Sequence, residues 1–173
     1  MKRIFILMLI TGLANSLSFA QENKPDKSKR PSPPAKVSET IASGAVITID
    51  YSQPSVKGRT IGKEIAPYGE VWRTGANEAT IFETSKDIQV EGKTLPAGKY
   101  GLYSIPREKS WTIIFNKIWN QWGTDYNEAE DQLRVVVKPL KSKKFTEKMT
   151  FEIAKNGKIS LWWGNKEVDF RVK

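Results

Sequence analysis

The sequence has 173 residues, 39% of them hydrophobic, which is ample for one globular domain and tight for two. It contains no cysteine and no histidine, which excludes disulfides, thiolate-ligated metals and nucleophilic catalysis by a serine–histidine or cysteine–histidine pair, and makes a typical zinc site unlikely. The formal net charge is +9, but from residue 37 onward 21 basic residues stand against 17 acidic ones, so a nucleic-acid partner is not indicated.

The first residues have the pattern of an export signal. Lys2 and Arg3 precede a mostly apolar run at residues 4–17, and residues 18–20 offer small side chains of the kind that a signal peptidase reads. The run is shorter than the ~20 apolar residues that a membrane span needs. We expect residues 1–20 to be a cleaved signal peptide and the protein to be exported, periplasmic or extracellular in a Gram-negative bacterium, with no transmembrane segment after cleavage. A retained N-terminal anchor is the alternative.

Proline and lysine dominate the segment that follows. Residues 21–36 contain four prolines and no large apolar side chain, so they cannot contribute to a core. We predict a disordered or polyproline-like spacer over residues 21–38, followed by a single folded domain over residues 39–173. Such a spacer would hold the domain away from a cell-envelope surface.

From about residue 37 onward, apolar residues repeat with a period of two, which is typical of strands with one buried face. About nine short strands are predicted, at residues 45–52, 79–84, 87–92, 99–106, 110–117, 132–139, 148–154, 157–164 and 166–173. Asn156 with Gly157, and Gly164 with Asn165, are typical hairpin turns. Helix is plausible only around residues 59–65 and 126–131. The lysine cluster at residues 138–144 is expected to be a solvated loop.

These elements predict an all-β fold, an antiparallel β-sandwich or jelly-roll-like barrel with one or two short helices. Helices and strands do not alternate, and the sequence has no glycine-rich phosphate loop, which excludes the nucleotide-binding α/β architectures. Trp162 and Trp163 are neighbours in one predicted strand and must point to opposite faces. One of them is therefore exposed or covered by a loop.

Four stretches of the sequence follow one another in a specific order: YSQPSVKGRTIG, APYGEVWRTGANEAT, GKTLPAGKYGLYSIP and WTIIFNK. Together they closely resemble the family catalogued as domain of unknown function 2911, over residues 43–139, and the VWRTGANEAT element is highly specific. The resemblance implies an exported, mainly β domain. It supplies no activity, because the biochemistry of the family is not established.

The VWRTGANEAT stretch, residues 71–80, is the first candidate for a functional site. Arg73 and Glu78 can make charged hydrogen bonds, and Asn77 can both donate and accept. Trp72 could supply an aromatic face on which a sugar ring stacks. The same residues could instead be structural, with Arg73 paired to Glu78 across the turn and Trp72 in the core.

Two further residues are candidates for the same site. Arg59, in the loop after the first predicted strand, could join Arg73 on an anionic group, although exposed pairs of this kind are more often solvated. Trp122 belongs to the aromatic and polar stretch at residues 116–131, a long loop of the kind in which binding residues concentrate. It could form an aromatic wall, or a tryptophan of this loop could plug the end of the sandwich.

These residues favour a non-enzymatic domain that binds a small polar or glycan-like ligand. One alternative is a glycoside hydrolase or lyase that uses Glu78 and a second carboxylate. Another is a structural envelope protein without a small-molecule site. The sequence assigns no catalytic residue, and we expect no metal, cofactor or nucleic acid.

Overall fold

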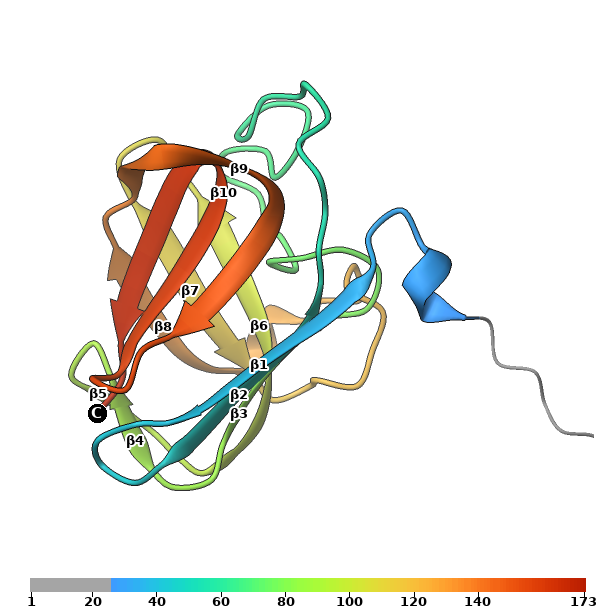
Figure 1. Ribbon diagram of the computed structural model, residues 1–173. Coiled ribbons are helices and arrows are strands. Elements are labelled where there is room, and N and C mark those ends of the chain that lie inside the picture. The colour runs from blue at the N-terminus through green and yellow to red at the C-terminus, as the bar shows by residue number, and fades with distance from the viewer. Residues whose placement is uncertain (1–25) are drawn as a thin grey trace, which may run out of the picture.

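Alternating apolar side chains build an all-β sandwich, which confirms the fold class predicted from the sequence (Figure 1). The computed structural model describes residues 26–173, so the expected signal peptide and the start of the expected spacer lie outside the described residues. Two short 3-10 helices and ten strands follow one another in the described part: η1 (Lys27–Lys29), β1 (Pro34–Thr40), β2 (Val46–Ser52), β3 (Thr80–Thr84), β4 (Ile88–Val90), β5 (Lys93–Leu95), β6 (Gly98–Pro106), β7 (Trp111–Asn116), η2 (Glu128–Glu130), β8 (Asp131–Val137), β9 (Leu140–Ile153) and β10 (Lys158–Arg171).

The larger layer is a six-stranded antiparallel sheet with the strand order β1-β2-β3-β6-β7-β8. Ile49 of β2 and Phe82 of β3 are buried, whereas Asp50 is exposed. This alternation gives the sheet an inner face, turned to the core, and an outer face. The register pairs Asp50 with Ile81 and Ile81 with Gly101, so these three residues lie in one row across the outer face.

The second layer contains β9 and β10, which pair antiparallel. β10 folds back on itself at Gly164, where φ is +57°. Lys158 Nζ consequently lies 3.3 Å from Asp169 Oδ2, and the N–H of Val172 donates to the carbonyl of Gly157 at 2.8 Å. Figure 1 shows the two halves of β10 side by side. Both predicted hairpin turns are therefore present.

A short hairpin of β4 and β5 lies beside the end of β10. Val90 of β4 bridges to Val172, and Gln89 exchanges two backbone hydrogen bonds with Lys173, of 2.9 and 3.0 Å. The last described residues are thus paired on both sides, with β4 on one and the start of β10 on the other.

Aromatic rings join the two layers. Phe115 of β7 packs edge-on against Phe82 of β3 and Phe170 of β10, with ring centroids 5.0 and 6.2 Å apart. Trp163 of β10 is buried and stacks on Trp72 at a centroid distance of 5.1 Å. The tryptophan that precedes it in the sequence is partly exposed, which confirms that the adjacent pair faces opposite sides.

β1 and β5 lie outside the predicted strands, and β9 begins earlier than the sequence predicts. β1 starts at Pro34, inside the segment predicted to be a spacer, because β1 is an edge strand and proline is tolerated at the first residue of such a strand. β9 starts at Leu140 and runs through the lysine cluster that the sequence predicts to be a loop. Residues 26–33, which we call the N-terminal arm, precede β1 and pack against the domain.

The helix predictions had different outcomes. η2 lies within the helix predicted around residues 126–131. Residues 59–65 form turns instead of a helix, and Gly62 there has a φ of +93°, which a helix does not accommodate.

Candidate functional site

The VWRTGANEAT stretch, residues 71–80, forms a turn that is hydrogen-bonded to β6 and that we call the signature turn. Asn77 has a φ of +61° and Thr74 one of +47°, both in the left-handed region that asparagine tolerates best among residues with a side chain. Gly75 is required for close packing, because a Cβ there would lie 2.5 Å from a threonine hydroxyl of β3. Thr74 Oγ1 donates to Ser104 Oγ of β6 at 2.9 Å, and both side chains are buried.

Trp72 belongs to the core, as its stacking on Trp163 shows, and its indole N–H donates to the carbonyl of the glycine three residues later, at 3.1 Å. The Arg73 side chain crosses Gly123, where an added Cβ would collide with Arg73 Cδ. The Nε of Arg73 is buried and has no hydrogen-bond partner among the described residues. Within residues 26–173 Arg73 forms no ion pair with Glu78, so the pairing considered from the sequence does not occur.

Glu78 and Asn77 instead hold the N-terminal arm. The Glu78 carboxylate accepts two hydrogen bonds from Arg30 Nη1, of 3.0 and 2.8 Å, and lies 2.9 Å from Lys27 Nζ. Asn77 Nδ2 donates to the carbonyl of Ser32 at 3.1 Å. Two of the six candidate residues therefore tie the arm to the signature turn.

The two cations change the acidity of Glu78. Partial burial acts to raise its pKa, but hydrogen bonds from Lys27, from its own backbone N–H and from Arg30 outweigh that effect, and the pKa falls from 4.5 to about 2. Glu78 is therefore ionised throughout the physiological pH range. A carboxylate held in this way can attract cations or accept hydrogen bonds, but it is a poor proton donor.

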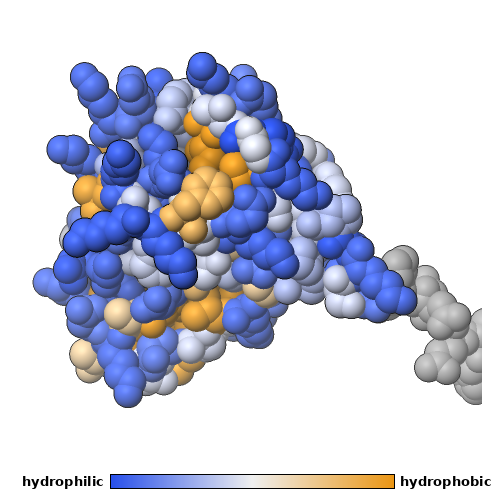
Figure 2. Space-filling view, turned by 45° about the horizontal axis from the view of Figure 1, so that its top comes forward, coloured by the Kyte–Doolittle hydropathy of each residue, from blue (hydrophilic) through white to orange (hydrophobic). Residues whose placement is uncertain are grey.

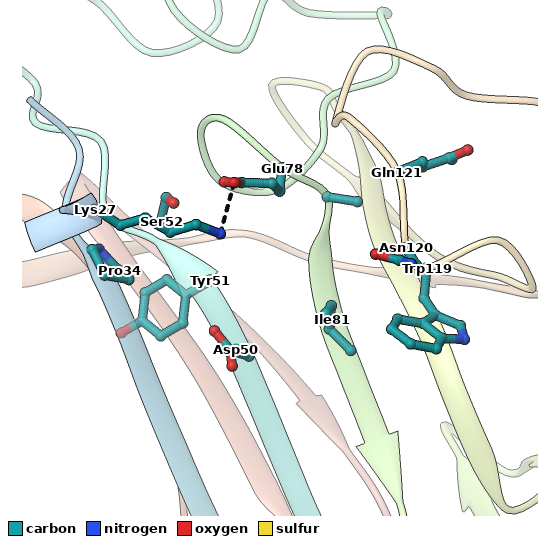
Figure 3. A pocket seen from close by; sticks show the side chains of 11 residues that line it. Lys27, Pro34, Asp50, Tyr51, Ser52, Glu78, Ile81, Trp119, Asn120 and Gln121 are labelled. Carbon is teal, nitrogen blue, oxygen red and sulfur yellow. Dashed lines mark ion pairs between the residues drawn. The ribbon is translucent and has the colours of Figure 1, made fainter. Parts of the chain in front are cut away.

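A depression of about 270 Å³ opens on the outer face of β2 and β3, and the ion pair of Glu78 with Lys27 is part of its lining (Figure 3). Asp50 and Ile81 line it from the sheet, and Trp119 and Gln121 line it from the loop after β7. Figure 3 shows Asp50 beside Ile81, with the Trp119 ring on the other side of Ile81. The Asp50 carboxylate and the Trp119 indole thus lie around one small open space, whereas the Gln121 side chain points away from them.

Gly101 allows this loop to lie against the sheet. A Cβ at Gly101 would come 2.6 Å from the carbonyl oxygen of Ile118, so any other residue would push the loop outward. The N–H of Ile118 donates to Asn116 Oδ1 at 3.0 Å, and Lys99 Nζ lies 5.2 Å from the centroid of the Trp119 ring. The glycine in the outer row is therefore what brings Trp119 beside the row.

A polar network holds the far end of the same loop. The Tyr126 hydroxyl donates to Asp131 Oδ2 at 2.7 Å, and Arg134 donates to both groups, at 2.7 and 2.8 Å. Burial raises the pKa of Tyr126, and the hydrogen bond to Asp131 acts in the same direction. Tyr126 also packs on Tyr103 at 4.9 Å, and the Tyr103 hydroxyl accepts from Gln121 Nε2 at 3.0 Å. The loop is thus fixed to the sheet at both ends.

Of the six candidates only Glu78 lines this depression, and the last two, Arg59 and Trp122, do not. Arg59 donates to carbonyls of its own loop at 3.1 and 2.8 Å and lines a different depression, beside Phe145. Trp122 is 48% exposed and is not among the residues that line the depression, although its backbone bridges to Glu78.

Sequence reasoning did not select the residues that line the depression on the sheet side. Trp119 lies in the same aromatic stretch as Trp122, and the spacing alone does not say which of the two turns toward the sheet. Asp50 had a usable signal, because a polar residue between apolar neighbours of one strand must face outward. Lys27 and Arg30 had none, since their partner is far away along the chain.

The described residues contain neither a metal-binding cluster of side chains nor a membrane-spanning helix. Among residues 26–173, no group of three or more acidic side chains is placed to hold a metal ion. Within the same range, no helical segment has the length and apolar character that a membrane crossing requires.

Comparison with known proteins identifies a family but no individual protein. No curated protein and no solved structure shows a significant match to the chain. The family model described as "Protein of unknown function (DUF2911)" matches residues 32–172, which include the signature turn and every residue that lines the outer-face depression except Lys27. The match confirms the resemblance seen in the sequence, and the chain belongs to the DUF2911 family.

Proposed function

We propose that the outer-face depression binds a small polyhydroxylated, glycan-like ligand without changing it chemically. The observation that carries this proposal is that the Trp119 indole lines one open space together with Asp50 and Asn120. Sugar rings bind proteins by stacking their C–H faces on an aromatic ring, while carboxylates and amides hydrogen-bond their hydroxyls. The depression offers both kinds of contact within the size of a small ligand.

The state of Glu78 favours binding over glycoside hydrolysis. A general acid in that reaction needs a raised pKa so that it carries a proton at neutral pH. The pKa of Glu78 is lowered to about 2, and its carboxylate is engaged by Lys27 and Arg30. Glu78 is therefore suited to orient the arm or a ligand and unsuited to donate a proton.

Trp119→Ala tests the proposal, with Trp122→Ala as its matched control. Both residues belong to the loop after β7, but only Trp119 lines the depression. We expect an oligosaccharide array to identify ligands of the wild type. Calorimetric titration with the best of them should then show affinity lost in Trp119→Ala and kept in Trp122→Ala. No ligand on the array, or equal losses in both variants, would contradict the proposal.

A structural role is the second candidate for part of the signature. Asn77 and Glu78 form hydrogen bonds with the N-terminal arm, and this role does not require a ligand. If their role is only to hold the arm, Glu78→Gln lowers stability and leaves ligand affinity at the depression unchanged. The two roles are compatible, because neither Trp119 nor Asp50 belongs to the arm's ion pairs, although Lys27 and Glu78 line the same depression.

We also propose that the protein works outside the cytoplasm. Lys2 and Arg3, followed by the apolar run at residues 4–17, support export. Mass spectrometry of the protein recovered from the periplasm or medium of an expressing bacterium should give an N-terminus near Gln21. A full-length chain confined to the cytosol would contradict this.

A further inference from the structure

A bend in β9 exposes an apolar side chain, that of Phe145, to solvent. Lys143, Lys144 and Phe145 are consecutive and all exposed, although they belong to one strand. Ser142 Oγ donates to the carbonyl of Lys144 at 2.8 Å and accepts from its N–H at 3.3 Å, which fixes the bend. The pairing register between β9 and β10 also shifts here, on both sides of Gly164. Phe145 is left 51% exposed at the outside of the bend.

Phe145 does not stand alone. A depression of about 260 Å³ beside it is lined by Val56, Ile61, Arg59 and Lys166, among others. Figure 2, in which the top of Figure 1 comes forward, shows a hydrophobic area bounded by hydrophilic side chains on this end of the molecule. The apolar area is therefore local and rimmed by polar groups, which is typical of an interaction surface.

The rim is strongly basic. Six basic residues surround Phe145 in the sequence of β9 or line the adjoining depressions: Arg59, Lys141, Lys143, Lys144, Lys148 and Lys166. None of the six forms an ion pair within residues 26–173. Two neighbouring acids are engaged elsewhere, since Glu147 accepts from the N–H of Lys57 at 2.8 Å and Glu167 lies 3.9 Å from Lys158. A third, Glu108, lines a depression together with two of the six basic residues, so the rim is basic but not free of acid.

We propose that this surface, the Phe145 face, docks on an anionic phospholipid bilayer. Unpaired lysines around an exposed phenyl ring match a surface that is negative at its headgroups and apolar just beneath them. A duplex nucleic acid or an acidic polysaccharide would satisfy the lysines but would offer the phenyl ring no apolar environment. The docking would place the outer-face depression near a membrane without any membrane-spanning helix, and it does not depend on what that depression binds.

Vesicle sedimentation tests the proposal on the protein as it is exported. The probes are vesicles of phosphatidylcholine mixed with phosphatidylglycerol, and vesicles of phosphatidylcholine alone. We expect binding to the anionic vesicles to be stronger and to weaken as salt is added. The double variant Lys143→Glu/Lys144→Glu should lose at least roughly tenfold in affinity, since each basic residue near an anionic surface contributes about a fivefold gain. Phe145→Ser should lose roughly tenfold.

Matched variants control for charge and for apolar surface elsewhere. Lys155→Glu/Lys173→Glu makes the same charge change at exposed residues away from the bend, and Val136→Ser removes an apolar side chain that is 67% exposed on β8. Both should bind anionic vesicles like the wild type. All variants share one N-terminal segment, so differences between them report on the surface that was changed.

Three results would overturn the proposal: equal binding to both vesicle types, a Phe145→Ser variant that binds like the wild type, and equal losses in the control variants. A mobility-shift assay with duplex DNA at the same salt concentration tests the main alternative partner, a duplex nucleic acid. Tighter binding to DNA than to anionic vesicles would also refute it. Trp119→Ala should bind vesicles normally, so failure of the glycan proposal leaves this one standing.

Discussion

Replacing Glu78 by glutamine removes the charge that ties the N-terminal arm to the signature turn. The lowered pKa, about 2 in place of 4.5, would at face value correspond to roughly 3 kcal/mol of unfolding free energy. The Glu78 side chain is 39% exposed, however, and solvent screening weakens such pairs. We therefore expect Glu78→Gln to lower the unfolding free energy at neutral pH by about 1–2 kcal/mol, which is roughly 3–8 °C in Tm.

The pH dependence of this stability difference shows whether the charge of Glu78 is its cause. Because folding lowers the pKa of Glu78, its stabilising effect is complete above the unfolded value of about 4.5 and is lost as the pH falls toward 2. Urea unfolding followed by circular dichroism should give a difference between wild type and Glu78→Gln that shrinks over this range. Glu70→Gln, at an exposed glutamate of the same loop region, should cause no change. A difference that persists at pH 2, or none at pH 7, would refute the reasoning.

Three further substitutions probe the scaffold of the site. Gly101→Val should lift the Ile118 backbone, lower the unfolding free energy by about 1–3 kcal/mol and abolish ligand binding at the depression, as thermal denaturation and calorimetry would show. Trp163→Ala should cost about 3–5 kcal/mol, since the ring is buried against Trp72, and the near-ultraviolet circular dichroism of the stacked pair should disappear. Tyr126→Phe should cost about 1 kcal/mol in urea unfolding, because it deletes one hydroxyl from a network that retains its charged pair.

The period-two pattern was sufficient to predict most strands, because strands such as β2 and β3 bury one face and leave the other at least partly exposed. It failed where a strand lacks a buried face of its own. β1 contributes only partly buried residues such as Val37 at the edge of the sheet, and its prolines resemble those of a linker. The first half of β9 crosses a bend, so Lys143 and Lys144 both face solvent and no alternation remains to be read.

The site was harder to predict than the fold for a related reason. The signature turn was correctly identified as unusual, but what its side chains contact is decided by distant segments. Arg30 lies 48 residues from Glu78 along the chain, and Trp119 reaches the outer row only because Gly101, on another strand, has no side chain. Local spacing contains information about turns and faces, and very little about which loops meet on one face.

The pairing of the residues around Val172 limits where the chain can be truncated. These residues fill the space between β4 and the start of β10, with backbone hydrogen bonds to Gln89 and Gly157. A chain that stops before Arg171 would leave two unpaired strand edges, and such edges template association with other chains. The domain therefore cannot close before residues 171–173 have been synthesised. Fusions beyond Lys173 should be tolerated, whereas losing a few residues before it should cause aggregation.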